Sequence, residues 1–152
     1  MLDVAQFILD EKQSAIATMK LQKLCYYAQA WTLVWTGTPL FDEDFQAWRD
    51  GPVCPELYES HRGQYSVSTI PGARPERLTA NQRTMIQSVL KAYSPFSGDQ
   101  LSTLTHLEDP WRLAREGVED GDRSQRPISK PAMRAYYLQR KERAMIQGQP
   151  AG

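Results

Sequence analysis

The stretch TMKLQKLCYYAQAWTLVWT, residues 18–36, decides the fold of this chain. Its apolar residues recur at steps of three, four and seven positions, and further apolar side chains occupy most of the remaining faces. Only Gln22, Gln29 and Thr36, seven positions apart, leave a narrow polar seam. A helix that is apolar nearly all round is typical of the inside of a domain. We therefore expect a central core helix over 18–36, with the other segments packed around it.

Composition limits what kind of protein this is. The chain has 152 residues, no formal net charge and 10% aromatic residues, so we expect one folded domain and neither disorder nor a general polyanion binder. No apolar run is long enough to span a membrane, and the first residues lack the features of a signal peptide. Two cysteines, Cys25 and Cys54, are too few for a disulfide framework, so we expect free thiols and a cytoplasmic location.

Apolar periodicity and turn residues predict the remaining elements. Thr18, Thr79 with Gln82, and Ser129 are expected to cap helices, and Gly37 to end the central one. Two short strands, Phe45–Arg49 and Ser66–Ile70, are expected to pair. The further helices are expected over residues 2–12, 55–63, 80–93, 98–107, 109–115 and 130–146. The predicted fold class is mainly α: a compact, single-domain helical bundle over residues 1–146 with a small two-stranded β element, followed by a disordered tail, 147–152.

Positive charge collects near the C-terminal end of the chain. Residues 123–143 hold seven lysines and arginines against Glu142 alone, and the preceding segment 116–122 is acidic. We favour a solvated helix face whose charge complements the acidic segment. The alternative is a site that binds nucleic acid or an acidic partner.

Catalytic and metal chemistry find little support. Cys54 precedes Pro55 at a predicted helix start, where the helix dipole lowers a thiol pKa, and His61 or His106 could supply a base. No nucleophile motif surrounds Cys54, so a Cys54-dependent hydrolase is a remote alternative. The histidines and cysteines lack metal-ligand spacing, and no glycine-rich phosphate loop is present. We therefore expect no catalytic residue, no metal site and no cofactor.

Three blocks of the sequence together resemble one known family. Residues 21–59, LQKLCYYAQAWTLVWTGTPLFDEDFQAWRDGPVCPELYE, resemble the signature of the Panacea antitoxin domain, also called the SocA-like or GepA-like, phage-associated family. LTHLEDPW at 104–111 matches its second block, and SKPAMRAYY at 129–137 lies where its last helix would. The matching positions are Leu21, Lys23, Leu24, Tyr26, Tyr27, Trp31, Gly37, Pro39, Leu40, Phe41, Ala47, Trp48, Gly51, Pro52, Val53, Pro55, Leu57, Tyr58, Thr105, His106 and Trp111.

The resemblance implies a mainly helical domain without enzymatic activity. It implies the antitoxin of a bacterial or prophage toxin–antitoxin system, which binds its cognate protein toxin directly. One family member acts as an adaptor that delivers its toxin to the ClpXP protease, so a ClpXP-type protease is a second expected partner. Membranes and nucleic acid are not expected partners. Many of the matching residues are fold residues, and we assign a structural role to Trp31, Gly51, Pro52, Pro55, His106 and Trp111.

The toxin site is predicted on the segment 41–58, because the central helix must be covered. This segment joins three acidic residues to aromatic side chains, a composition that suits a toxin with a basic site. The predicted contacts are Asp42, Asp44, Trp48, Arg49, Asp50 and Tyr58. In the alternative, Trp48 only packs a strand onto the core, and the partner binds the last helix through Arg134, Tyr137 and Arg140.

Overall fold

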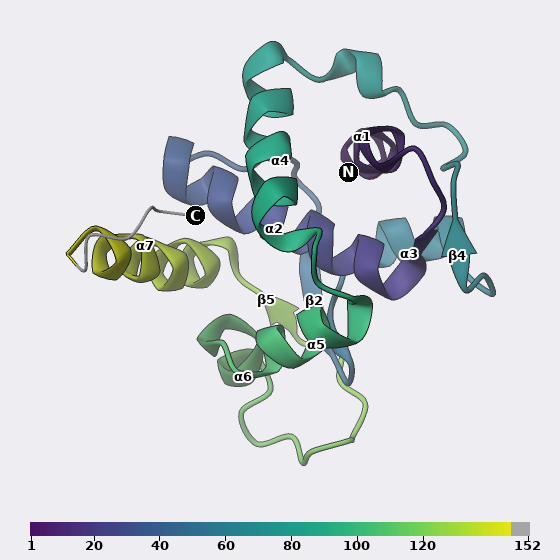
Figure 1. The fold of residues 1–152 in the computed structure, drawn as a ribbon. Coiled ribbons are helices and arrows are strands. Elements are labelled where there is room, and N and C mark those ends of the chain that lie inside the picture. The colour runs from purple at the N-terminus through teal and green to yellow at the C-terminus, as the bar shows by residue number, and fades with distance from the viewer. Residues whose placement is uncertain (147–152) are drawn as a thin grey trace.

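Seven α-helices make up most of residues 1–146, the part of the chain that the computed structural model describes (Figure 1). They are α1 (Leu2–Lys12), α2 (Thr18–Thr36), α3 (Pro55–His61), α4 (Ala80–Tyr93), α5 (Gly98–His106), α6 (Asp109–Ala114) and α7 (Lys130–Ile146), with a short 3-10 turn, η1 (Pro75–Arg77). The mainly helical class is confirmed, and each helix lies within one or two residues of its predicted bounds. The predicted tail, 147–152, lies outside the described residues.

Helix α2 crosses the middle of the molecule, with α1 and α4 above it and α5 and α6 below it in Figure 1. It contacts α1, α4, α5 and α7. Every residue from Leu21 to Val34 is buried, including the polar ones. The predicted central core helix is confirmed with its predicted bounds.

The polar seam of α2 fixes the segment that follows the helix. The Gln29 carboxamide accepts a hydrogen bond from Leu40 N and donates one to Phe41 O, both at 2.7 Å. In the same way, Gln22 accepts from Cys54 N at 2.9 Å and donates to Cys54 O at 3.3 Å. Each buried carboxamide thus satisfies backbone groups that would otherwise be buried without partners.

The predicted caps are confirmed with one exception. Gly37 ends α2 with a φ of 76°, Thr79 and Gln82 form a capping box, and Ser129 Oγ accepts from Ala132 N at 3.1 Å. Thr18 is the exception, since its hydroxyl donates to Tyr65 O at 3.2 Å and caps no helix N–H. The backbone N–H of Thr18 also donates to Tyr65 O, because a strand pair leads directly into α2.

Five short strands form two antiparallel sheets in the described chain. β1 (Ile16–Ala17) pairs with β4 (Ser66–Val67), which gives the small two-stranded element. β2 (Phe45–Trp48) lies between β3 (Gly51–Val53) and β5 (Pro127–Ile128). The predicted pairing of 45–49 with 66–70 is therefore wrong. Gly51, at a φ of +121°, lets the chain turn back at once, so β2 pairs with its sequence neighbour.

A buried carboxylate that the sequence did not predict joins α2 and α7. Glu108, 2% exposed, lies between α5 and α6 and accepts hydrogen bonds from Tyr27 OH at 2.6 Å and Tyr137 OH at 2.8 Å. Burial raises the pKa of the Glu108 carboxyl, and the two hydroxyl groups only partly oppose that rise. Tyr27 also stacks on Tyr93 of α4 with ring centroids 4.0 Å apart.

Both cysteines are buried free thiols, as predicted. Cys25 is part of the core face of α2, and burial raises its pKa, which makes it unreactive.

Replacing Trp31 with alanine is expected to lower the free energy of unfolding by about 3–5 kcal/mol. The ring is 3% exposed and its indole N–H donates to Tyr93 OH at 2.8 Å, so the substitution leaves both a cavity and an unpaired hydroxyl. Urea unfolding measures the change. Tyr65→Ala, at a side chain 87% exposed, is the control and should change it by less than about 0.5 kcal/mol. Equal effects of the two substitutions would contradict the core position of Trp31.

Glu108→Gln is expected to change how stability depends on pH. Because the pKa of Glu108 is raised in the folded state, the folded protein binds the proton more tightly, and stability falls as pH rises from about 4.5 through the raised pKa. The glutamine variant keeps an oxygen for both tyrosine hydroxyls but has no proton to lose, so this fall should be missing. Urea unfolding between pH 4 and about 8 tests it, with Glu119→Gln as the control for net charge. Identical pH slopes for wild type and Glu108→Gln would contradict it.

Candidate partner-binding site

A cleft of about 610 Å³ opens between the start of α2, the β2–β3 hairpin, α3 and the segment that precedes β5. Four of the predicted partner contacts, Trp48, Arg49, Asp50 and Tyr58, line this cleft together. We call these four residues the Trp48 surface. The first turns of α2 also line the cleft through Thr18, Met19, Gln22 and Lys23, so the central helix is not wholly covered, contrary to the prediction.

Trp48 is half-buried and held in place from two sides. Its ring lies edge-on against Tyr58, with centroids 5.0 Å apart, and its indole N–H donates to Gln46 Oε1 at 2.8 Å. Its carbonyl accepts from the indole N–H of Trp111 at 2.8 Å. Trp111 itself stacks on His106 at 4.0 Å, so these two motif residues support the backbone of Trp48 from behind.

Arg49 and Asp50 form the exposed tip of the hairpin. Their side chains are 52% and 61% exposed, and the Arg49 Nε lies 3.9 Å from the Asp50 carboxylate. Such a long, exposed ion pair contributes little to stability. Both groups are therefore available to a partner.

Lys23 forms part of the cleft wall and is the residue whose importance the sequence did not reveal. It is 1% exposed, and its ammonium donates to Pro52 O at 3.2 Å. Burial lowers the pKa of Lys23 to about 8, and the nearby charge of Asp50 only partly opposes this. A lysine inside an otherwise apolar helical pattern is the signal that marks it.

Gly51 lies directly against Lys23. A Cβ at Gly51 would meet Lys23 Cε at 2.6 Å and Thr105 Oγ1 at 3.2 Å, so a larger residue would force the buried Lys23 side chain to move. The Gly51-Pro52 pair thus places the hairpin at hydrogen-bond distance from the buried ammonium.

The lowered thiol pKa predicted for Cys54 from its position at a helix start is wrong. Its thiol donates to Glu56 Oε2 at 3.2 Å, and burial raises its pKa to about 12, although the backbone N–H groups of Glu56 and Leu57 oppose that rise. His61 is buried, its Nε2 lies 3.0 Å from Gln22 Nε2, and burial lowers its pKa. The helix start gives too little stabilisation to the thiolate to outweigh burial.

The acidic residues predicted to steer the toxin lie apart from the Trp48 surface. Asp42 and Asp44 line a separate hollow of about 480 Å³ with Glu43 and Glu56. Lys130 of α7 donates to Asp44 Oδ1 at 2.6 Å and to Asp42 O at 2.8 Å. The two surfaces proposed as rivals therefore meet here, where the start of the basic helix neutralises part of the acidic segment.

The rival surface on α7 is smaller than predicted. Arg134 is exposed, and the Arg140 guanidinium lies over the Tyr136 ring, 5.9 Å from its centroid. Tyr137 is fully buried, so its side chain is not part of a surface that a partner can reach.

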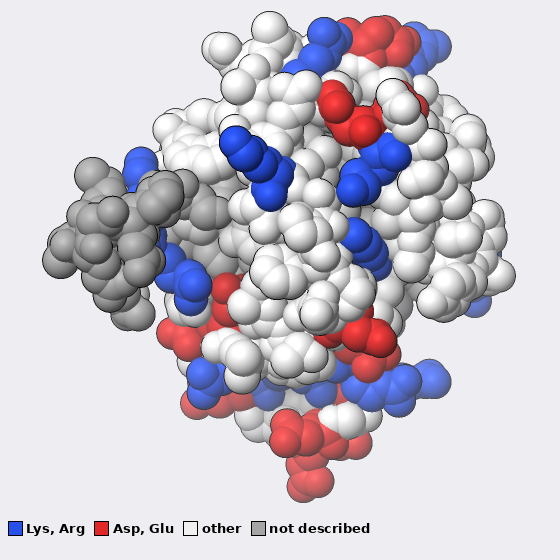
Figure 2. Space-filling view, in the orientation of Figure 1, with Lys and Arg blue, Asp and Glu red and all other residues white. Residues whose placement is uncertain are grey.

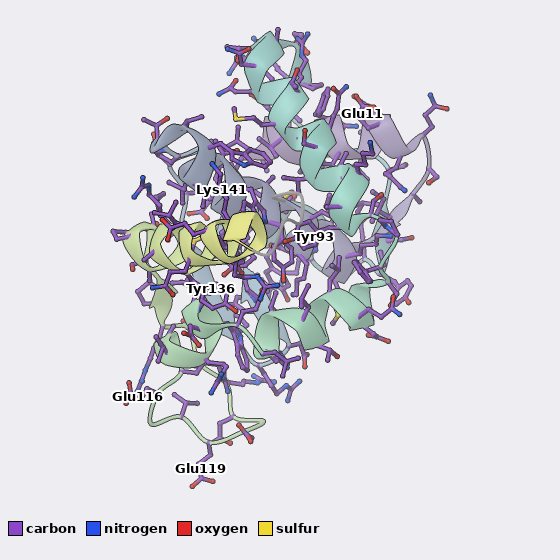
Figure 3. All side chains as sticks on the ribbon, turned by 60° about the vertical axis from the view of Figure 1, so that its left-hand side comes forward. Glu11, Tyr93, Glu116, Glu119, Tyr136 and Lys141 are labelled. Carbon is purple, nitrogen blue, oxygen red and sulfur yellow. The ribbon has the colours of Figure 1, made fainter. Side chains whose placement is uncertain are left out.

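The segment between α6 and β5 carries charges of both signs. Figure 2 shows them gathered at the lower end of the molecule, and in Figure 3 Glu116 and Glu119 point away from the body. Arg115 anchors the segment from inside, because its buried guanidinium donates to Ala47 O at 3.0 Å and to Asp122 O at 2.6 Å.

Comparison with known proteins shows where this architecture belongs. The family described as antitoxin SocA-like, Panacea domain, matches residues 21–112, from α2 into α6. The chain belongs to this antitoxin family. It is 41% identical to antitoxin SocA of Caulobacter vibrioides (strain NA1000 / CB15N) over 130 residues, which cover 75% of this chain and 69% of that protein. No solved structure matches the chain significantly. The resemblance inferred from the three sequence blocks is confirmed.

Two further properties concern residues 1–146 only. Within that range, none of the helices of this family member is long and apolar enough to cross a bilayer. The same residues contain no group of three or more histidine, cysteine or carboxylate side chains arranged to hold a metal ion.

Gly51→Ala is expected to destabilise this antitoxin-family domain by about 1–3 kcal/mol more than Gly72→Ala, measured by urea unfolding. Both glycines have positive φ, so both substitutions strain the backbone, but only the Cβ at Gly51 would overlap Lys23. Gly72 has nothing within 4 Å of such a Cβ and is the matched control. Equal losses would mean that the hairpin moves freely away from α2.

Proposed function

We propose that this chain holds the cognate toxin of a bacterial or prophage toxin–antitoxin pair inactive by binding it directly in the cytoplasm. Membership of the SocA-like Panacea family gives an antitoxin role and implies a toxin as partner. We propose further that the toxin contacts the Trp48 surface, while Asp42 and Asp44 steer its approach from the neighbouring hollow. The chain itself performs no catalysis in this proposal.

The observation that carries the proposal is the half-exposed Trp48 ring, held on a backbone to which Trp111 donates a hydrogen bond. Binding energy at protein interfaces concentrates in a few Trp, Tyr and Arg residues. Trp48, Arg49 and Tyr58 supply all three types at one cleft. Because the Trp48 backbone and indole N–H are already bonded, binding requires little further ordering of this residue.

A second mechanism has the toxin bind the same surface but leads to its degradation. In that alternative the chain is an adaptor that presents the bound toxin to a ClpXP-type protease. Blocking and delivery differ in one respect, since only delivery requires the protease. Protection against the toxin in cells that lack ClpXP favours blocking, and loss of protection there favours delivery.

Two remote alternatives have less support. A nucleic-acid site on the basic run would have part of its charge engaged within the chain, since Lys130 bonds Asp44 and the Arg126 guanidinium bonds Glu116 O. A Cys54-dependent hydrolase would need a thiolate, and the pKa of Cys54 is raised to about 12.

Co-expression tests the proposal directly. Each reading frame next to this gene is induced with and without the chain, and we expect one of them to stop growth only when the chain is absent. Trp48→Ala and Arg49→Glu should abolish protection, because loss of a hot spot costs about 2–4 kcal/mol, roughly a 30- to 1,000-fold weaker complex. Asp42→Lys/Asp44→Lys should reduce protection through slower association.

Controls separate lost binding from lost folding. Arg49 is 52% exposed, so Arg49→Glu should keep the wild-type circular dichroism spectrum and melting temperature. Arg134→Glu/Arg140→Glu on α7 makes a matched reversal of charge and should still protect. If the α7 variant loses protection while the Arg49 and Trp48 variants keep it, the toxin binds α7.

A further inference from the structure

The cleft beside Trp48 has a strong local excess of positive charge. Four cationic side chains line it, Lys23, Arg49, Arg62 and Arg123, against the single carboxylate of Asp50. The whole chain has equal numbers of basic and acidic residues, so this is a concentration of charge and not a general property of the surface. The hollow around Asp42 has the opposite composition.

The cations of the cleft are poorly paired within the chain. Arg62 reaches Glu59 only at 4.0 Å, between two side chains about 70% exposed, and Arg49 reaches Asp50 only at 3.9 Å. Within the described residues, no carboxylate lies within 4.0 Å of Arg123 or of the Lys23 ammonium. By contrast, Lys130 is held to Asp44 at 2.6 Å. The cleft therefore holds positive charge that the fold does not neutralise.

Of these four cations, the Lys23 ammonium carries the largest free-energy cost of burial. Its ammonium has three N–H donors, and Pro52 O is the one acceptor found for it in the described chain. A buried ammonium without a counter-charge is expensive, which agrees with the lowered pKa of Lys23. Because the Lys23 side chain is 1% exposed, a carboxylate held in the cleft would act on its ammonium as a nearby counter-charge.

We propose that the cleft binds an acidic peptide segment of the toxin, with carboxylates paired with Arg62 and Arg123 close to the buried Lys23 and an apolar residue packed against Trp48 and Tyr58. This inference rests on the proposed function and names the chemistry of the partner. Apolar walls from Met19 and Val53 favour a peptide over a nucleic acid. A volume of about 610 Å³ suits a few side chains and not a folded domain.

The test uses the purified full chain and two labelled peptides with amidated C-termini. One is acidic, GLEDELG, and in the other, GLQNQLG, glutamine and asparagine replace the acidic residues. Fluorescence anisotropy measures affinity, and NMR follows the Trp48 indole and the Lys23 Cε signals. We expect the acidic peptide to bind at least tenfold more tightly than the amide peptide, to shift both sets of signals, and to raise the pKa of Lys23. Equal affinities, or shifts confined to α7, overturn the inference.

Charge-reversed variants locate the binding. Arg62→Glu/Arg123→Glu should weaken the acidic peptide at least tenfold, while the matched control Arg77→Glu/Lys91→Glu, away from the cleft, should stay within twofold of wild type. Equal weakening by both variants would show only a general effect of net charge and overturns the inference. The inference is also overturned if a labelled DNA duplex binds the cleft more tightly than the acidic peptide does.

Co-expression separates this inference from the proposed function. If Arg62→Glu/Arg123→Glu protects fully while Trp48→Ala does not, the toxin binds the Trp48 surface without an acidic segment in the cleft, and only this inference fails. If the wild-type chain protects against no neighbouring reading frame, the proposed function fails whatever the peptides do. Loss of protection by Arg62→Glu/Arg123→Glu, with the control still protective, supports both.

Discussion

Two buried carboxamides on α2 fix both ends of the segment that carries the β2–β3 hairpin. Gln29 bonds the backbone at residues 40–41 and Gln22 bonds both backbone groups of Cys54. An amide buried without partners costs several kcal/mol, so each glutamine is tolerated in the core only while the chain returns to the same place. The β2–β3 hairpin lies between these two bonded positions, residues 40–41 and Cys54. The position of the hairpin, and hence of Trp48, therefore depends on the hydrogen bonds of Gln22 and Gln29, which lie seven residues apart on α2.

The core of the fold is readable from the sequence because it depends on local periodicity. Helix α2 was predicted with its observed bounds, and the capping box at Thr79 located α4, since both signals lie within a few neighbouring residues. The strand pairing was not predictable in the same way. Residues 66–67 could pair with any exposed strand, and only the tertiary path of α1 brings them to β1. Likewise, nothing in the sequence around Glu108 shows that two tyrosines from α2 and α7 meet it.

Only part of the candidate site could be predicted from the sequence, for a related reason. Trp48, Arg49, Asp50 and Tyr58 lie close in sequence, and the hairpin followed by α3 keeps them together in space. The contributions of Lys23 and Arg123 come from distant segments and needed the fold to be seen. The acidic residues at 42 and 44 are near Trp48 in sequence, yet they precede β2, and they line another hollow where Lys130 bonds Asp44. Proximity along the chain therefore predicted that Trp48 and Tyr58 lie together, and it misjudged the charge around them.

The guanidinium of Arg115 holds the backbone of the segment between α6 and β5 while several of its side chains face outward. Because its contacts are with the backbone oxygens of Ala47 and Asp122, they do not depend on which side chains the segment carries. Arg123 follows directly after this clamp and reaches the cleft, while Glu116 and Glu119 face solvent (Figure 3). Substitutions among the outward side chains therefore leave the core intact and change only what the surface presents. The outward positions of this segment can therefore vary without disturbing the buried helix or its carboxamides.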